Sequence, residues 1–160
     1  MIFVCVGSRE YQFDRLLKEM DNILERTKLP ESVFAQIGQS TYLPQNFEFE
    51  RFLSQDEFEK YQNEAKLIIS HGGTGALVGA LKKNKKVIAV PRLAKFGEHI
   101  DDHQLQVSGV LSKEKYLVTV TDMDTLENQI LLMLANETTK KYNKPSYVFE
   151  IIDGFIRENI

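Results

Sequence analysis

The segment with the clearest chemical potential is a glycine-rich turn, Ser70-His71-Gly72-Gly73-Thr74-Gly75-Ala76. It follows an apolar run of strand length, 67–69, and precedes a helical pattern that reaches Lys83. Glycine lets a backbone approach a ligand closely, and the free N–H groups and dipole of a helix start attract an anion such as a diphosphate. His71 and Thr74 would add hydrogen-bond donors. The alternative is a tight strand-to-helix turn that binds nothing.

This turn differs from the two best-known phosphate-binding motifs. Its glycines lack the G-x-G-x-x-G spacing, with an acidic residue about 20 positions later, that marks a dinucleotide site. They also lack the G-x-x-x-x-G-K-[ST] pattern of a P-loop, and the chain has no G-x-S-x-G elbow for a Ser-His-Asp triad. The turn therefore predicts an anion-binding helix start without indicating any of these three chemistries.

Polar residues also gather after the next apolar run, in the segment from Pro91 to Gln104. In a parallel sheet this segment lies beside the glycine-rich turn, because the carboxyl ends of neighbouring strands meet at one edge. Arg92 could contact a phosphate there, and Gln104 could hydrogen-bond to hydroxyl or carbonyl groups. The segment thus predicts further contacts to the same ligand.

Two histidines in this segment raise the question of a metal. His99 and His103 are four residues apart, so on a helix they share one face, and Glu98 or Asp102 could join them as ligands. The spacing lacks the adjacent glutamate of H-E-x-x-H, and nothing in the sequence places a third ligand. A solvated helix start with acidic residues in its first turn is the plainer interpretation. We therefore predict no metal here.

Apolar runs of strand length alternate with helical patterns along the chain. We expect strands at 2–6, 33–37, 67–69, 87–90 and 116–120, with a short extended piece within 47–53. We expect helices at 13–24, 54–63, from the glycine-rich turn to 83, at 101–111, at 123–134 and from Pro145. Ser54 and Glu57 form the S-x-x-E capping box of the second helix. The alternation predicts an α/β fold with a Rossmann-like, doubly wound parallel sheet.

Such a sheet binds ligands beyond the carboxyl ends of its strands. The loops to consider are therefore 7–12, 38–46, 53–54, 70–75, 91–100 and 120–122. Gly7-Ser8 and Gly38 fall in these loops, each directly after a strand. We expect one domain over 1–160, in which a terminal helix at 143–160 either docks a partner with its apolar face or packs on the sheet.

Composition excludes several classes of protein. The 160 residues include 20 Lys and Arg against 23 Asp and Glu, a net charge of −3, which argues against a general nucleic-acid binder. Cys5 is the single cysteine, so an intramolecular disulfide is impossible. No apolar run approaches the roughly 20 residues of a membrane span, and the N-terminus resembles a strand, not a signal peptide. The length suits one nucleotide-binding domain, since two would need about 100–200 residues each.

Taken together, the motifs resemble the C-terminal, donor-binding domain of glycosyltransferase family 28 over nearly the whole chain. The matching strings are Phe3-Val4-x-Val6-Gly7-Ser8, Phe13-Asp14-Arg15-Leu16-Leu17, Gln36-x-Gly38, 68–75, Pro91-Arg92, Phe96-Gly97-Glu98-His99 and Asp102-His103-Gln104. Within the family the chain is similar to short, two-component types. One is the catalytic subunit of the GlcNAc transferase that extends dolichyl-diphosphate-GlcNAc, and the other is a bacterial β-1,4-galactosyltransferase subunit of capsule and exopolysaccharide synthesis. The resemblance implies one half of a GT-B glycosyltransferase.

The resemblance implies a UDP-sugar site with three parts. The uracil would lie near Phe52 and Leu53, the diphosphate at 72–76 beside Gly7-Ser8, and the sugar near His103 and Gln104. The expected donor-binding residues are Gly7, Ser8, Gly38, Phe52, Leu53, His71, Gly72, Gly73, Thr74, Gly75, Ala76, Arg92, Glu98, His99, His103 and Gln104. The chain departs from the family at Gly79, where a glutamate usually holds the ribose hydroxyls.

The resemblance further implies an inverting hexosyltransferase that takes a UDP-sugar as substrate, with no cofactor and no metal. It would move galactose or GlcNAc to a lipid-linked saccharide. The general base of a GT-B enzyme commonly comes from the other domain, so no catalytic residue is assigned here and a membrane-anchored, acceptor-binding partner is expected. The chain would be cytoplasmic, held at the inner face of the membrane by that partner. The alternative, favoured by Gly79, is a non-catalytic nucleotide-sugar-binding or enhancer subunit that stabilises a catalytic partner.

Overall fold

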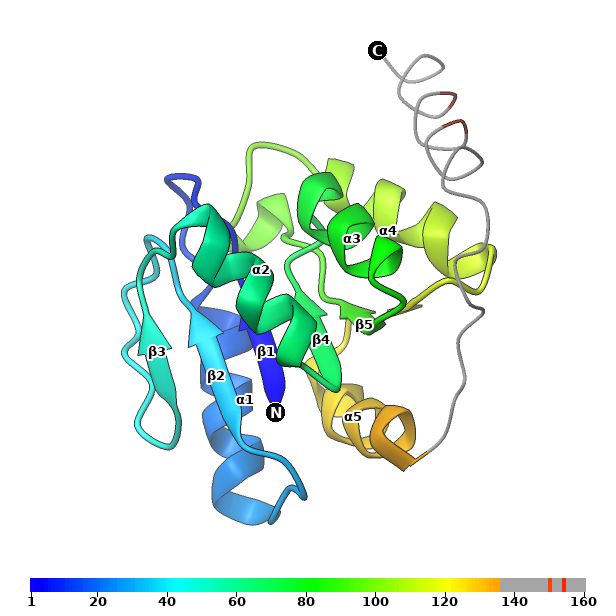
Figure 1. The fold of residues 1–160 in the computed structure, drawn as a ribbon. Coiled ribbons are helices and arrows are strands. Elements are labelled where there is room, and N and C mark those ends of the chain that lie inside the picture. The colour runs from blue at the N-terminus through cyan, green and yellow to red at the C-terminus, as the bar shows by residue number, and fades with distance from the viewer. Residues whose placement is uncertain (136–149, 151–153, 155–160) are drawn as a thin grey trace.

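Six parallel strands form the central sheet of the computed structural model, which describes residues 1–135, Glu150 and Gly154 (Figure 1). The strands are β1 (Ile2–Cys5), β2 (Val33–Gln36), β3 (Glu48–Glu50), β4 (Leu67–Ser70), β5 (Lys86–Ala89) and β6 (Val118–Thr119). Their spatial order is β3-β2-β1-β4-β5-β6, the doubly wound order of a Rossmann-like fold. The predicted fold class is therefore confirmed, and the order reverses between β1 and β4.

Helices cover both faces of this sheet. On one face lie α1 (Asp14–Arg26) and α5 (Leu126–Ala135), and on the other lie α2 (Gln55–Glu64), α3 (Thr74–Lys82) and α4 (His103–Lys113) (Figure 1). Two short 3-10 helices, η1 (Ala94–Phe96) and η2 (Met123–Thr125), precede α4 and α5. Because both faces are covered, all four residues of β1 and all four of β4 are buried, as parallel central strands require.

Side chains of β1 alternate between two hydrophobic layers. Ile2 and Val4 pack in the layer under α1 and α5, whereas Phe3 packs in the layer under α2, α3 and α4. The Phe3 ring meets two aromatic rings of α2, Phe58 edge-on at 5.4 Å and Tyr61 stacked at 5.6 Å between centroids. These contacts hold α2 above the carboxyl end of β1, where the start of the helix reaches the candidate site described below.

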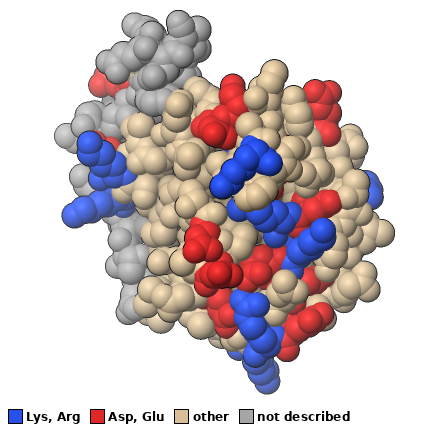
Figure 2. Space-filling model, turned by 180° about the vertical axis from the view of Figure 1, so that it is seen from behind, with Lys and Arg blue, Asp and Glu red and all other residues tan. Residues whose placement is uncertain are grey.

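The face that carries α1 and α5 shows acidic and basic side chains interspersed (Figure 2). Arg26 at the end of α1 illustrates the pattern, since it pairs with Glu19 of the same helix at 2.7 Å and with Glu127 of α5 at 2.6 Å. Such exposed pairs contribute little stability individually. They do link the two helices of this layer at the surface.

Most predicted element boundaries agree with the structure, and three do not. The α-helix expected at 123–134 begins only at Leu126, after the 3-10 helix η2. The capping box is confirmed, because Ser54 Oγ accepts from the Glu57 amide at 3.2 Å and Glu57 Oε2 accepts from the Ser54 amide at 2.8 Å. The helix expected from 101 begins only at His103. The strand expected over 116–120 is shortened because Lys115 takes a left-handed φ of 64° and the Tyr116 amide donates to the Leu111 carbonyl at 3.1 Å, which together close the end of α4.

The predicted terminal helix at 143–160 lies outside the described residues, apart from Glu150 and Gly154. Its predicted docking face therefore stays a prediction. Among the helices that the structure does describe, none has the length and apolar character needed to cross a bilayer.

Candidate functional site

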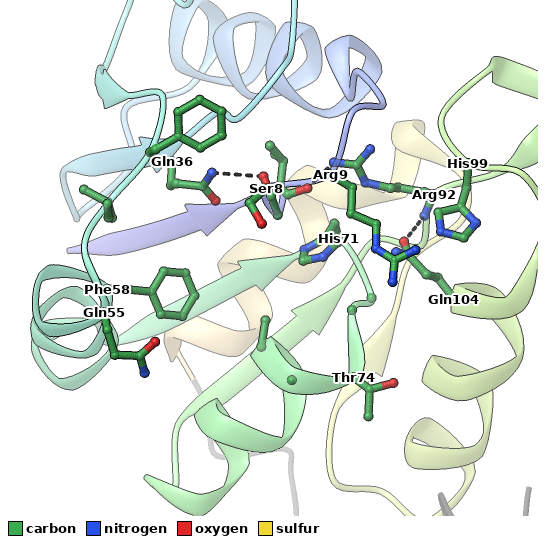
Figure 3. Close-up of a pocket in the computed structure, with 18 of the residues that line it drawn as sticks. Ser8, Arg9, Gln36, Gln55, Phe58, His71, Thr74, Arg92, His99 and Gln104 are labelled. Carbon is green, nitrogen blue, oxygen red and sulfur yellow. Dashed lines mark hydrogen bonds between the residues drawn. The ribbon is translucent and has the colours of Figure 1, made fainter. Parts of the chain in front are cut away.

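A pocket of about 600 Å³ opens at the carboxyl ends of β1 and β4, where the strand order reverses (Figure 3). Loops diverge at such a switch point, so ligands of doubly wound folds bind there. The loop after β1, the glycine-rich turn after β4, the segment after β5 and the starts of α2, α3 and α4 form its walls. Of the predicted site residues, these line the pocket: Gly7, Ser8, Phe52, Leu53, His71, Gly72, Gly73, Thr74, Gly75, Ala76, Arg92, His99, His103 and Gln104.

The start of α3 supplies anion-binding groups to this pocket. Gly73 is the N-cap, with no side chain hydrogen-bonding to the cap and no acidic residue in the first turn. The first intrahelical bond runs from the Leu77 amide to the Gly73 carbonyl at 3.0 Å, so the amides before Leu77 precede the helical ladder. These N–H groups and the positive end of the helix dipole provide a binding place for a phosphate group.

His71 stands in the floor of the pocket between two glycines. A Cβ at Gly7 would lie 2.7 Å from its Nε2, and a Cβ at Gly73 would lie 2.8 Å from its Cε1, so any larger residue at either position would collide with the ring. Nδ1 lies 3.2 Å from the Cys5 carbonyl oxygen. Because a carbonyl only accepts, Nδ1 carries the proton in this bond.

The electrostatics of the site keep His71 neutral. Burial lowers the pKa of His71 to about 3, and the positive charge of Arg92 adds to the effect. With its proton on Nδ1, the neutral ring offers Nε2 to the pocket as an acceptor. The prediction that His71 donates to an anion is therefore wrong for this arrangement, because its single N–H already serves the backbone of β1.

Gly72 brings the glycine-rich turn against the start of α4. It has a φ of +87°, and a Cβ there would lie 3.2 Å from the Gln104 Cβ and 3.3 Å from the Pro91 Cα. This close approach places Gln104 beside the turn. Its Oε1 accepts from the Arg92 amide at 3.1 Å, which leaves its side-chain N–H groups as donors for a ligand.

Arg92 lines the pocket but does not offer its guanidinium freely. The side chain is 1% exposed, and Nη1 donates to the Tyr11 carbonyl at 2.7 Å and to the Glu98 carbonyl at 3.1 Å. Nη2 donates to the carbonyl of Val6. Burial lowers the pKa of Arg92 to about 10, so the group stays charged at neutral pH. The expected phosphate contact is therefore replaced by a brace that holds the loop after β1.

Two predicted site residues do not line the pocket. Glu98 is fully buried, and its Oε2 accepts from Arg15 Nε at 2.9 Å while Oε1 accepts from the Leu93 amide at 3.0 Å. A buried carboxylate needs such partners, so Glu98 holds the 91–102 segment together and does not bind a ligand. Gly38, with a φ of +54°, packs beneath the Gly7 carbonyl, where a Cβ would collide with that oxygen. The prediction that Gly38 binds the donor is therefore wrong, because this glycine packs against Gly7 from outside the pocket.

The two histidines of the 91–104 segment do not share a helix face. His103 is the first residue of α4, whereas His99 lies in the turn before it. His99 Nδ1 lies 3.1 Å from Asp101 Oδ1, and the same carboxylate oxygen accepts from the His103 amide at 3.0 Å, which lowers the pKa of Asp101. Across residues 1–135, with Glu150 and Gly154, no group of three or more His, Cys, Asp and Glu side chains is arranged to hold a metal ion.

Sequence reasoning missed several residues of the pocket: Val6, Arg9, Gln36, Ser54, Gln55 and Phe58. Arg9 could have been found from the sequence, because it lies in the 7–12 loop, which follows the first expected strand and so belongs to the binding edge of the sheet. Phe58 and Gln55 had none, since they reach the pocket only because α2 packs over Phe3. Gly79 does not line the pocket, and a Cβ there would face α2, 3.6 Å from Gln62 Oε1.

The architecture is a Rossmann-like α/β unit of the kind that forms one half of a GT-B glycosyltransferase, with a pocket at its topological switch point. The family model described as "Glycosyltransferase family 28 C-terminal domain" matches residues 1–151. The chain therefore belongs to the glycosyltransferase family 28 C-terminal domain family.

Curated relatives share this type of sequence. The chain is 30% identical over 109 residues to the UDP-N-acetylglucosamine transferase subunit ALG13 of Kluyveromyces lactis, covering 63% of this chain and 51% of that protein. It is 26% identical over 136 residues to the human protein of the same name, covering 75% of this chain and 11% of that one. The chain thus spans about half of the yeast relative and about a tenth of the human one.

Solved structures support the fold. An NMR structure of ALG13 aligns with a TM-score of 0.59 at 15% identity, covering 90% of this chain and 89% of that chain. A Methanocaldococcus jannaschii UDP-GlcNAc 2-epimerase aligns with a TM-score of 0.61 at 12% identity, covering 98% of this chain and 45% of that chain. At these identities the likeness concerns the fold.

Proposed function

We propose that this chain is the UDP-sugar-binding subunit of an inverting, metal-independent glycosyltransferase. The observation that carries the proposal is the start of α3, whose N–H groups open into a pocket that no Asp or Glu side chain of the described residues lines. An uncapped helix start without neighbouring carboxylates suits a diphosphate. Membership of a glycosyltransferase family and the names of the curated relatives favour a UDP-sugar over other diphosphates.

Catalysis would depend on stabilising the leaving group. As the bond between the sugar and the diphosphate breaks, negative charge develops on the diphosphate, and the fixed N–H groups of Thr74, Gly75 and Ala76 would stabilise it without rearranging. In the same proposal Gln104 donates to the sugar, and the uracil lies by Phe52 and Leu53. No cofactor or divalent ion takes part in this mechanism.

The acceptor side of the reaction would come from another chain. The acceptor hydroxyl must lose a proton, and we propose that the base belongs to a membrane-anchored, acceptor-binding partner. The chain would then work in the cytoplasm, held peripherally at the membrane through that partner. The predicted helix at 143–160 is the proposed docking element.

The transferred sugar would be a hexose, either galactose or GlcNAc, and the acceptor a lipid-linked saccharide in polysaccharide synthesis such as that of capsule or exopolysaccharide. The names of the curated relatives support GlcNAc, while the similarity of the sequence to bacterial β-1,4-galactosyltransferase subunits supports galactose. Competition between the two UDP-sugars for the purified chain would decide between them.

A second candidate function rests on Gly79. With glycine on α3 in place of the usual family glutamate, the described residues offer the ribose no carboxylate from this helix. The chain would then be a non-catalytic subunit that binds a nucleotide sugar weakly and stabilises its partner.

Calorimetry with UDP, UDP-galactose and UDP-GlcNAc tests the donor site, first on the chain alone and then on its complex with the proposed membrane-anchored partner. Saturable binding together with sugar transfer by the complex supports the enzyme. Absence of binding in both preparations would refute the donor site. Transfer that persists when Gln104 is replaced by Ala would remove Gln104 from the proposed donor site, and full activity of the chain alone would refute the two-component arrangement.

A further inference from the structure

The charge balance of the pocket is simple. Among the described residues that line it there is no Asp or Glu, and two side chains carry a permanent positive charge, Arg9 and Arg92. A nucleoside diphosphate brings at least two negative charges, and charged hydrogen-bond donors are the groups that pair most strongly with phosphate oxygens. The question is which of the two arginines is placed to do so.

Arg92 is not placed to balance the charge of a ligand, because both of its Nη groups already donate hydrogen bonds to backbone carbonyls. Nη1 donates to the carbonyls of Tyr11 and Glu98, and Nη2 donates to the carbonyl of Val6. If the guanidinium moved toward a ligand, these carbonyls would lose their hydrogen-bond donor. That loss is unfavourable here, because Arg92 is 1% exposed and the region is buried. Two N–H bonds remain, one on Nη2 and one on Nε, and the Nε group is buried without a hydrogen-bond partner among the described residues.

Two of the carbonyls that accept hydrogen bonds from Arg92 belong to residues that flank Arg9 in the sequence. Val6 directly follows β1, and Tyr11 lies shortly before α1, so the brace fixes the two ends of the short loop that carries Arg9. Arg92 therefore acts as a positioning residue for that loop. Its own charge reaches the pocket only at a distance.

Arg9 has the opposite character. Its side chain is exposed and forms no hydrogen bond or ion pair with any residue of the described part of the chain. Figure 3 shows it extending from the loop after β1 toward the space between His71 and Gln104. Its charge acts on both His71 and Arg92, which places it within electrostatic reach of the pocket floor.

We propose that Arg9 is the side chain that neutralises the diphosphate of the bound nucleotide sugar, acting opposite the N–H groups at the start of α3. This inference rests on the proposed function. The guanidinium fork pairs with phosphate oxygens on one side of the ligand while the helix start contacts the other. The neutral His71 between them cannot share this role, because its N–H is bonded to Cys5.

Calorimetry on the full chain separates the contribution of the phosphate groups to the binding free energy from that of the nucleoside. Uridine, UMP and UDP are titrated into the wild type, R9Q, R9K and a control, K28Q, which removes the same charge from an exposed position after α1. We expect R9Q to weaken UDP binding roughly tenfold or more, in line with the loss of a charged hydrogen bond, and to leave uridine binding unchanged. R9K should fall between R9Q and the wild type, and R9Q should flatten the salt dependence of UDP affinity.

Three outcomes would overturn the proposal. UDP binding by R9Q at wild-type strength would show that Arg9 does not contact the diphosphate, while the donor site itself would stand. An equal loss for uridine and UDP would show that R9Q deforms the loop. If the wild-type protein binds none of the three ligands, either alone or in its complex with the partner, the proposed function is refuted and this inference with it.

Discussion

The imidazole of His71 occupies the space that a side chain at Gly73 would need. A Cβ at Gly73 would lie 2.8 Å from the His71 Cε1 and closer still to Nε2, although the φ of Gly73, −67°, suits any residue. The glycine is therefore required by the histidine and not by backbone strain. His71 is hydrogen-bonded to the Cys5 carbonyl of β1, and Gly73 is the N-cap of α3, so this contact links the end of β1 to the start of α3.

Replacing Gly73 by Ala tests this relationship. We expect G73A to lower the free energy of unfolding by about 1–3 kcal/mol, because the added methyl group overpacks against the ring. The loss should largely disappear in an H71A background. Urea denaturation of the two single variants and the double variant gives the coupling energy. G75A is the control, since a Cβ there meets nothing within 4 Å. Equal cost of G73A in both backgrounds would contradict the contact.

Acid sensitivity follows from the neutral state of His71. Above pH 6.5 the ring is neutral in both the folded and the unfolded chain. Below it the unfolded chain takes up a proton that the folded protein, with a His71 pKa of about 3, does not, so stability falls as pH drops through that window. The free energy of unfolding should therefore decrease less in H71N than in the wild type between pH 6.5 and about pH 5. Parallel curves would show that His71 is not held neutral.

The buried pair of Arg15 and Glu98 should stabilise the 91–102 segment. E98Q leaves the Arg15 guanidinium without its carboxylate at a largely buried position, and we expect a loss on the order of 3 kcal/mol in unfolding free energy. E64Q, at an exposed carboxylate of α2, is the matched control and should change stability by less than about 0.5 kcal/mol. If the two variants unfold at the same denaturant concentration, the pair is not structural.

Gly79 offers a stabilising substitution. It lies inside α3, where glycine is about 1 kcal/mol less favourable than Ala, and a Cβ would make ordinary contact with Gln62 at 3.6 Å. G79A should therefore raise the free energy of unfolding by up to about 1 kcal/mol. Thermal unfolding measures the gain. A loss would mean that the Gln62 side chain cannot adjust to the added methyl group.

Gln104 and Gln106 provide a matched pair on α4. Gln104 lines the pocket, whereas Gln106 is exposed one half-turn away. In the proposed enzyme, Q104A should reduce sugar transfer by the complex at least about tenfold, the loss expected for a hydrogen bond made to the reacting sugar. Q106A should leave the rate unchanged. Equal rates for the two variants would remove Gln104 from the proposed site, and far-UV circular dichroism checks that both remain folded.

Local pattern was sufficient for much of the fold. The Ser54-Glu57 capping box was predictable because both partners lie within one helical turn. The parallel sheet was predictable because its buried strands are continuous apolar runs. The strand at 116–120 was also predictable, but its shortening to Val118–Thr119 was not, since the left-handed Lys115 and the bond from the Tyr116 amide that end α4 are not indicated by any residue pattern.

The sequence by itself determined the alternation of strands and helices along the chain and the glycine-rich start of α3, whereas the spatial order of the strands, and with it the switch point between β1 and β4, came from the tertiary structure. Only the tertiary structure decided how each polar group there is used. Arg92 is occupied by the carbonyls of Val6 and Tyr11, 86 and 81 residues away along the chain, and His71 by that of Cys5, 66 residues away. Hydrogen bonds between such distant residues leave no trace in residue spacing, and they separate the arginine that braces the loop from Arg9, which the loop presents to the pocket.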